Sequence, residues 1–104
     1  MADPDVFAAL ASPVRRSLLE LLTQRSQSVN ELAARFEMRR PSVSEHLKVL
    51  KDAGLVNEHR AGRHRVYEID AAPLREVADW LHPFEQFWRS RARALADLLD
   101  DEET

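Results

Sequence analysis

One stretch of the chain decides its fold: Pro41-Ser42-Val43-Ser44-Glu45-His46-Leu47-Lys48-Val49-Leu50-Lys51-Asp52-Ala53-Gly54-Leu55-Val56. Its apolar residues recur at i, i+4 and i+7, the spacing of one buried helix face: Val43, Leu47 and Leu50. Pro41 is tolerated in a first helical turn, and Gly54 stands where a C-terminal cap takes a positive φ. The stretch therefore predicts a helix over 41–53, followed by extended chain.

A second helix is predicted immediately before this one. Ser28 is followed three residues later by Glu31, a capping box that marks a helix N-terminus. Apolar residues then recur at helical spacing: Val29, Leu32, Ala33 and Phe36. Residues 37–40 form a tight connection to the 41–53 helix, so the pair predicts a helix-turn-helix.

Two further helices are predicted nearer the N-terminus. The first covers residues 5–11. The second begins at Pro13, because Ser12 is a good N-cap and proline is tolerated at the first helical position. A polar loop over 24–27 separates this second helix from the helix-turn-helix.

Strands and a last helix are predicted in the remainder of the chain. The period of the apolar residues changes to two, and two short strands around the turn Ala61-Gly62-Arg63 predict a β-hairpin over 57–69. A final helical region over 70–99 follows, with Pro83 marking a kink or a break. Residues 100–104 form an acidic tail that we expect to fray.

The predicted order is helix, helix, helix, helix, hairpin, helix, a mainly α fold with a small β-hairpin and a winged helix-turn-helix layout. A chain of 104 residues suits a single domain. It has no cysteine, which excludes disulfides and cysteine nucleophiles, and no apolar run approaches the ~20 residues that span a bilayer. The acidic start, residues 1–5, lacks the layout of a signal peptide, so we expect a cytoplasmic protein without membrane contact.

The charge is distributed unevenly along the chain. The net charge is −3, yet residues 13–67 carry eleven Lys or Arg against six Asp or Glu, a balance of +5. Residues 68–104 carry four Arg against ten acids, a balance of −6. A basic middle segment indicates nucleic-acid contact by that segment, whereas chance patterning of solvated faces is the alternative.

The side of the 41–53 helix opposite its apolar face is suited to the DNA major groove. At 100° per residue this side holds the following residues: Pro41, Glu45 and Lys48, flanked by Ser42, Ser44 and Val49. Short serine side chains let a helix approach base edges, and Glu45 can accept a hydrogen bond from a cytosine amino group. Arg39 and Arg40 precede the helix and can neutralise phosphates.

The predicted hairpin supplies a second basic surface. Four basic residues lie at or beside its turn: Arg60, Arg63, His64 and Arg65. Such a hairpin can follow the DNA backbone or enter the minor groove, where arginine gains from the negative potential. Polar helices and charged edge strands are also common without any partner. In this order along the chain, the features indicate double-stranded DNA as the partner.

The last helix carries more apolar surface than a small monomer can cover. We expect one stripe to pack on the winged domain and another to meet a second copy across a two-fold axis: Leu81, Phe84, Trp88 and Leu95. Two alternatives stay open. All of the stripe could fold onto one core, or its Trp and Phe side chains could line a pocket for a small apolar ligand.

Several segments of the chain resemble the ArsR/SmtB family of bacterial repressors, over about residues 5–70. The similar segments run from Phe7 to Leu22, from Val29 to Ala33, from Pro41 to Val56 and from Arg60 to Tyr67. Their most specific part is the run Val43-Ser44-Glu45-His46-Leu47 ending in Ala53-Gly54-Leu55-Val56, followed by Gly62-Arg63. The resemblance implies a non-enzymatic, homodimeric repressor that binds a palindromic operator. The 41–53 helix would lie in the major groove and the 57–69 hairpin would form the wing, with the DNA-binding core spanning 13–67.

The resemblance also implies roles for individual residues. It places Ser42, Ser44, Glu45 and His46 at or near the groove, and Arg63 and Arg65 on the wing. His46 lies at the border of the buried side, so a packed histidine is the alternative. Dimerisation would use the 70–99 helix and the first helix, including Phe7, and would place two recognition helices roughly 34 Å apart.

The chain departs from the metal-sensing members of that family. Ala33 and Arg35 stand where an arsenic-type site has its cysteines. A comparable zinc cluster on the last helix would need Asp79, His82 and Glu85, whose spacing drifts around the helix. We therefore expect no cofactor and no obligatory metal. The alternatives are a ligand- or metal-responsive sensor that uses the C-terminal helix, and a winged-helix protein-interaction module, for which the basic excess is unexpected.

Overall fold

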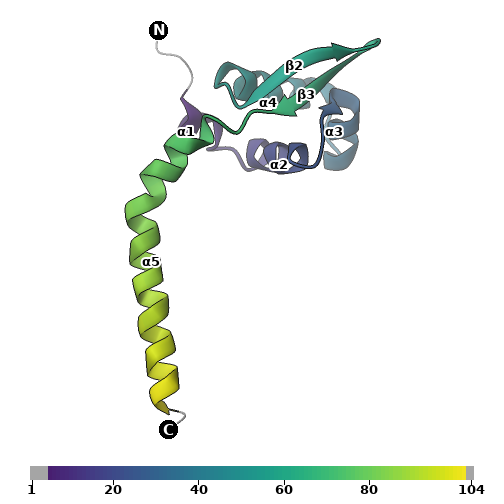
Figure 1. Ribbon diagram of the computed structural model, residues 1–104. Coiled ribbons are helices and arrows are strands. Elements are labelled where there is room, and N and C mark those ends of the chain that lie inside the picture. The colour runs from purple at the N-terminus through teal and green to yellow at the C-terminus, as the bar shows by residue number, and fades with distance from the viewer. Residues whose placement is uncertain (1–4, 103–104) are drawn as a thin grey trace.

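The computed structural model of the protein describes residues 5–102. Figure 1 shows a small winged domain from which one long helix extends. The elements follow in this order: α1 (Val6–Ala9), α2 (Pro13–Leu22), β1 (Gln27–Ser28), α3 (Val29–Phe36), α4 (Arg40–Asp52), β2 (Val56–Ala61), β3 (His64–Ile69) and α5 (Leu74–Glu102). The fold is mainly helical with a three-stranded antiparallel sheet, which confirms the predicted winged helix-turn-helix.

The helix ends follow the caps that the sequence predicted. The Ser12 hydroxyl accepts a hydrogen bond from the Arg15 backbone N–H at 3.3 Å. Ser28 and Glu31 form both hydrogen bonds of the capping box. Helix α4 begins one residue earlier than predicted, at Arg40, and Gly54 follows its end with a φ of 79°. These local bonds satisfy backbone groups that a helix terminus leaves free.

The sheet has one strand more than predicted, because the segment 24–27 is not entirely a loop. Gln27 pairs with Tyr67 and Ser28 with Val66, which adds β1 beside β3 and gives the strand order β1-β3-β2. Gln27 is fully buried, and its Nε2 donates to the Leu21 carbonyl at 2.8 Å. Two residues are too few to display a period of two, so the apolar pattern carries no signal for this strand.

The hydrophobic core lies between helices α2, α3 and α4 and one face of the sheet. Its residues come from the helices and strands of the winged domain and include Leu18, Leu22, Leu32, Val43, Leu47, Leu50, Leu55, Val56 and Tyr67. Val43, Leu47 and Leu50 have no exposed surface, which confirms the predicted inner face of α4. Because this face is fixed by the core, the opposite face of α4 must point outward.

Helix α5 is one continuous element rather than two helices separated at Pro83. Proline removes one intrahelical hydrogen bond and kinks a helix, and strong helix formers on both sides let the helix resume. Figure 1 shows a bend in the first third of α5. The helix starts at Leu74, later than predicted, because Asp70 accepts from the Ala72 N–H in a preceding turn.

The acidic C-terminal segment differs from the predicted tail. Residues 100–102 belong to α5, so the helix extends beyond its predicted end near residue 99. Residues 103–104 lie outside the described part of the chain, as do residues 1–4 of the acidic start. The fraying expected for 103–104 therefore stays a prediction.

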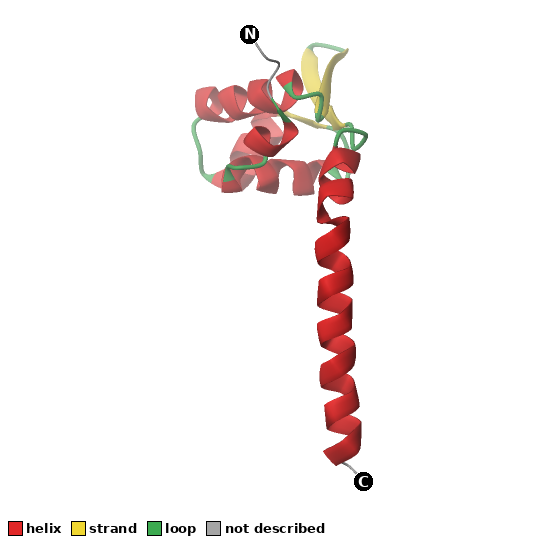
Figure 2. Ribbon diagram, turned by 90° about the vertical axis from the view of Figure 1, so that its left-hand side faces the viewer, coloured by secondary structure: helices red, strands yellow, loops and turns green. Residues whose placement is uncertain are grey.

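The described residues form an elongated body because α5 leaves the winged domain. The principal extents are 65 × 34 × 21 Å. Figures 1 and 2 both show the distal part of α5 clear of every other element. Only its beginning is packed: Leu74 and Val77 lie against the core, and the Trp80 ring meets Phe7 of α1 at 6.0 Å between centroids.

Candidate nucleic-acid interface

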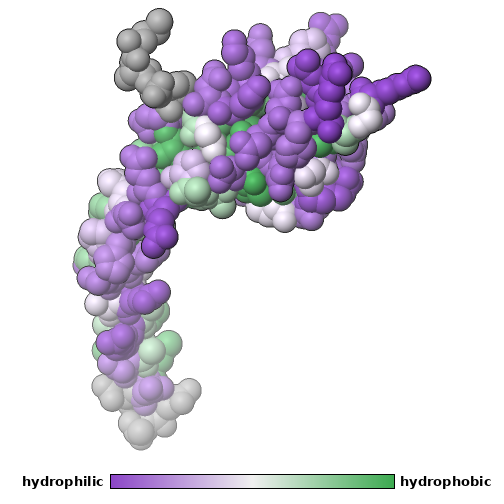
Figure 3. All heavy atoms as spheres, turned by 45° about the horizontal axis from the view of Figure 1, so that its top comes forward, coloured by the Kyte–Doolittle hydropathy of each residue, from purple (hydrophilic) through white to green (hydrophobic). Residues whose placement is uncertain are grey.

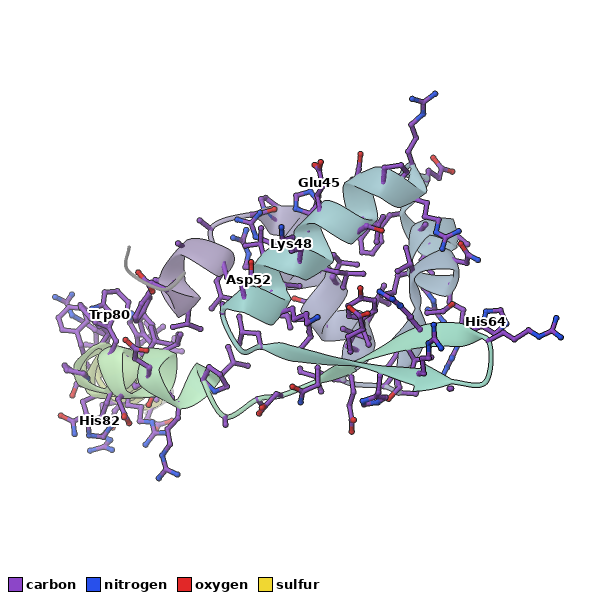
Figure 4. The ribbon with its side chains drawn as sticks, turned by 90° about the horizontal axis from the view of Figure 1, so that it is seen from above. Glu45, Lys48, Asp52, His64, Trp80 and His82 are labelled. Atoms are coloured by element: carbon purple, nitrogen blue, oxygen red, sulfur yellow. The ribbon has the colours of Figure 1, made fainter. Side chains whose placement is uncertain are left out.

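The outer edge of α4 holds most of the groove residues predicted from the sequence. Pro41, Glu45 and Lys48 are exposed, whereas Ser42 and Ser44 are half-buried at the flanks. Figure 4 shows Glu45 and Lys48 in line along this edge, with Asp52 continuing the line toward the end of the helix. The edge therefore presents short polar and charged side chains on a rigid helix, the arrangement that a major groove admits.

His46 lies at the side of this edge and contacts Arg15 of α2. Its Nδ1 is 3.3 Å from the Arg15 Nη1, and His46 is half-buried. The same guanidinium donates to the carbonyls of Ala9 at 2.6 Å and Ala8 at 3.2 Å. His46 thus joins α4 to the corner between α1 and α2. This geometry favours the packed alternative over direct contact with a base.

The wing is a hairpin with a two-residue turn at Gly62 and Arg63. Gly62 has a φ of 65°, as the first central position of a type II′ turn requires. Arg60, Arg63 and His64 are exposed, and Figure 4 shows His64 at the far end of the hairpin. Arg60 stands directly opposite Arg65 in the strand register. Like charges opposite each other repel, and a carboxylate or phosphate beside either arginine offsets this repulsion.

Arg65 differs from the other wing cations because it already has an anionic partner. Its Nη1 lies 3.0 Å from a Glu58 carboxylate oxygen, and the Tyr67 hydroxyl donates to the other oxygen at 3.0 Å. Lys51 at the end of α4 approaches the same carboxylate at 3.4 Å. The Glu58 side chain is 15% exposed, far less than those of Arg65 and Lys51.

The charge state of this cluster follows from its contacts. Burial acts to raise the pKa of Glu58, but the hydrogen bond from Tyr67 and the charges of Lys51 and Arg65 outweigh it and lower the pKa. Burial and the adjacent carboxylate raise the pKa of Tyr67. Glu58 and Lys51 were not among the site residues predicted from the sequence. The hairpin register, which sets Glu58 opposite Tyr67, was the available signal.

A basic hollow connects the start of α4 with the wing. It has a volume of about 210 Å³ and is lined by Ser28, Val29, Asn30, Arg40, Arg63, His64 and Arg65. Arg40 comes from the first turn of α4, whereas the other three basic residues come from the turn and strand β3 of the wing. Clustered guanidinium groups with serine and asparagine donors are suited to phosphate oxygens. Arg39 is exposed just before α4.

The capping box at the start of α3 is held by a surface ion pair. Arg25 Nη1 lies 2.7 Å from Glu31 Oε2. The hydrogen bond from Arg25, together with that from the Ser28 backbone, lowers the pKa of Glu31. This pair balances one arginine of the basic middle segment, so Arg25 contributes less to an anion-binding surface than the wing cations do.

Most of the large apolar side chains of α5 are exposed. Phe84, Trp88 and Leu95 of the predicted dimer stripe are 44%, 56% and 59% exposed, and Phe7 is 36% exposed. Leu81 is half-buried. Further large side chains share this exposure: Trp80, Phe87, Leu98 and Leu99. Figure 3 shows apolar residues between hydrophilic ones along α5, whereas the winged domain presents a mostly hydrophilic face.

Two other kinds of site are not found in the described residues. Within 5–102, no group of three or more His, Cys, Asp or Glu side chains could hold a metal ion. Of the predicted candidates, His82 lies with its Nε2 3.3 Å from Gln86 Nε2 on the next turn of α5. In that same range, every helix is too short or too polar to cross a membrane.

Comparison with known proteins identifies relatives of the chain. Residues 12–58 match the arsR family of bacterial regulatory proteins. The chain is 40% identical over 100 residues to the HTH-type transcriptional regulator Rv2034 of Mycobacterium tuberculosis, which covers 95% of this chain and 91% of that protein. It is 32% identical over 80 residues to the transcriptional repressor SdpR of Bacillus subtilis, covering 77% of this chain and 89% of that protein.

A related solved structure shares the fold. It is the solution structure of a homodimeric winged helix-turn-helix DNA-binding domain from Mycobacterium bovis, a possible ArsR-family transcriptional regulator. The two structures agree with a TM-score of 0.64 at 30% sequence identity, over 78% of this chain and 76% of that chain. The two chains therefore share the winged helix-turn-helix fold.

Proposed function

This chain belongs to the ArsR family of DNA-binding transcriptional regulators, which are not enzymes, and we propose that it is a homodimeric repressor of a palindromic operator. In this proposal α4 enters the major groove with Ser42, Ser44, Glu45 and Lys48 toward the base edges. The wing lies along the adjacent backbone. Residues 13–67 form the DNA-binding core, and 70–99 serve in dimerisation.

One observation carries the DNA part of the proposal: the basic hollow joins Arg40 of α4 to Arg63, His64 and Arg65 of the wing. A phosphate seated there would be held by both elements at once. Its position would then fix α4 in the neighbouring groove, because phosphate contacts set the register of a protein on a duplex. His46 contributes by holding α4 against the α1–α2 corner rather than by reading a base.

The dimer part of the proposal depends on the exposed stripe of α5. Phe84, Trp88 and Leu95 are large apolar side chains that are each about half exposed, and Phe7 is 36% exposed. Exposed apolar side chains that follow one another along a helix mark an interaction surface. A second copy would cover it, and the relative from M. bovis is a homodimer. Dimerisation would bring two recognition helices to successive turns of one DNA face. The repressor SdpR, similar over most of this chain, supports repression rather than activation.

Footprinting on selected DNA tests the proposal. Duplexes bound by the purified full chain are recovered from fragmented genomic DNA of the source cell, and protected bases are mapped by hydroxyl-radical cleavage. We expect two symmetric protected segments whose centres lie roughly 34 Å, about one helical turn, apart. A single asymmetric segment would contradict the dimeric arrangement. Failure to enrich any duplex would contradict the proposed operator.

Repression itself needs a separate measurement. A reporter gene placed behind the recovered duplex should be expressed less when the protein is present than when it is absent. Higher expression in the presence of the protein would identify an activator and would contradict the repressor assignment while leaving DNA binding intact.

A further inference from the structure

The Glu58 carboxylate joins side chains of three elements at the junction of recognition helix and wing. Glu58 is on β2, and it receives Lys51 from α4, Arg65 from β3 and the hydroxyl of Tyr67 from β3. The N–O and O–O distances of these contacts lie between 3.0 and 3.4 Å. No other carboxylate in the described residues is paired with cations from both α4 and the wing.

The contacts of Glu58 have two physical consequences. The first is mechanical, because a largely buried carboxylate with three donors resists sliding of the hairpin along α4. The second is electrostatic. The side chains of Lys51 and Arg65 are 51% and 66% exposed, and the single negative charge of Glu58, which both of them contact, offsets one of their two positive charges. Lys51 and Arg65 are therefore less available to the phosphates of a non-specific duplex than Arg60 and Arg63, for which the described residues show no ion pair.

We propose that Glu58 is a positioning residue that sets the angle between wing and recognition helix and restrains Lys51 and Arg65, so that operator DNA is favoured over other duplexes. The inference rests on the proposed function, because it concerns the same DNA surface. A specific duplex must then contact both α4 and the wing while the angle between these two elements stays fixed. A non-specific duplex gains little from the two restrained cations, since its binding depends on phosphate neutralisation alone.

The substitution Glu58→Gln tests this role, with Glu68→Gln as its matched control. Both replace a wing-strand carboxylate by an amide and change the net charge equally. The amide introduced by Glu58→Gln keeps an oxygen that can accept from Tyr67, so the core is disturbed little. The Glu68 side chain is 55% exposed, and among the described residues its ion-pair partner is His59, at 3.4 Å, rather than Lys51 or Arg65.

The measurement compares two duplexes across a series of salt concentrations. One duplex is enriched by the wild-type protein from a randomised pool, and the other is a scrambled duplex of equal length. We expect Glu58→Gln to bind the scrambled duplex about fivefold more tightly than Glu68→Gln, since two cations are released. The salt slope on this duplex should steepen by about one for each released cation. The preference for the enriched duplex should fall about tenfold.

The outcomes separate the positioning role from a structural one. If Glu58→Gln weakens binding to both duplexes equally, or behaves as Glu68→Gln does, the inference is wrong although the protein binds DNA. If the wild-type protein prefers no duplex, the proposed function fails and this inference with it. Circular dichroism checks folding. Should Glu58→Gln unfold, Tyr67→Phe removes one donor from the same carboxylate and must lower the preference for the enriched duplex. An unchanged preference in that variant would overturn the proposal.

Discussion

At the scale of single residues, the structure separates features that are local in sequence from contacts between distant segments. The caps at Ser12 and Ser28 depend on residues three positions apart, so their types alone predicted them correctly. The contact of His46 with Arg15 spans 31 positions. A helical angle placed His46 at the border of the buried side, but no periodicity could name its partner.

The contacts of Glu58 at the candidate site could not be predicted from the sequence either. The sequence pattern assigned Glu58 no role beyond its place on the predicted hairpin. Its pairing with Tyr67 across the hairpin follows from the register, yet the approach of Lys51 depends on how α4 packs against the sheet. The sequence therefore predicted the basic residues of the wing without showing that one of them, Arg65, is already paired.

The first prediction concerns the stability of the fold in acid. The pKa values of Glu58 and Glu31 are lowered from a reference of 4.5. A lowered pKa means that each carboxylate contributes stability above the unfolded-state pKa and loses it as the pH falls through the folded-state value. The free energy of unfolding, measured with urea, should therefore decrease below about pH 4.5.

A variant makes this acid prediction specific to Glu58. Glu58→Gln lacks the titrating group, so its free energy of unfolding should decrease less between neutral and acidic pH than that of the wild type. Parallel decreases in the two proteins would show that the interactions of Glu58 do not favour its charged form in the fold.

At the scale of elements, the helices were predicted correctly where apolar residues repeat at helical spacing. The inner face of α4 was predicted residue by residue, because three buried positions repeat at helical spacing. The strand β1 was missed, since its two residues are ordered by pairing with β3 rather than by their own pattern. Helix α5 continues past Pro83. The sequence could not decide this, because a proline inside a helical pattern can either kink a helix or end it.

The second prediction concerns the end of α4. Gly54 has a φ of 79°, and its N–H donates to the Lys51 carbonyl at 2.9 Å. A Cβ there would meet the Pro73 Cγ at 3.5 Å, an ordinary contact, so backbone strain is the main cost of a side chain. Gly54→Ala should lower the free energy of unfolding by about 1 kcal/mol.

Asparagine provides the control for this prediction, because it tolerates the left-handed region better than alanine does. Gly54→Asn should therefore unfold at a higher denaturant concentration than Gly54→Ala. Equal midpoints for the two variants would indicate that the cost comes from contact with Pro73 instead of from φ.

At the scale of the whole molecule, the extended α5 is the feature that an isolated chain does not explain. Its distal half lies clear of every other element of the described residues (Figure 1), and its large apolar side chains are exposed: Trp88, Leu95, Leu98 and Leu99. The sequence predicted this surplus of apolar surface from composition and spacing. It could not show how far the helix projects, because that depends on where the winged domain ends and α5 leaves it.

The third prediction tests what covers this surface. In sedimentation equilibrium the wild type should have twice its chain mass of 12.0 kDa. Trp88→Glu should shift the mass toward a single chain, because a charge buried without a partner in an apolar interface is strongly unfavourable. Gln86→Glu places the same charge on the opposite side of α5 and should leave the dimer intact. A dimeric Trp88→Glu variant would place the interface elsewhere.

The central claim is that the outer edge of α4 and the basic wing bind one duplex together, and DNA affinity tests it most directly. The variant Ser44→Ala with Arg63→Ala removes one side chain from each element. The matched variant Ser17→Ala with Arg75→Ala makes the same changes on α2 and α5. On the enriched duplex the first should lose at least about tenfold in affinity, with an unchanged free energy of unfolding, and the second should bind as the wild type does. Equal affinities of the two variants would contradict the account.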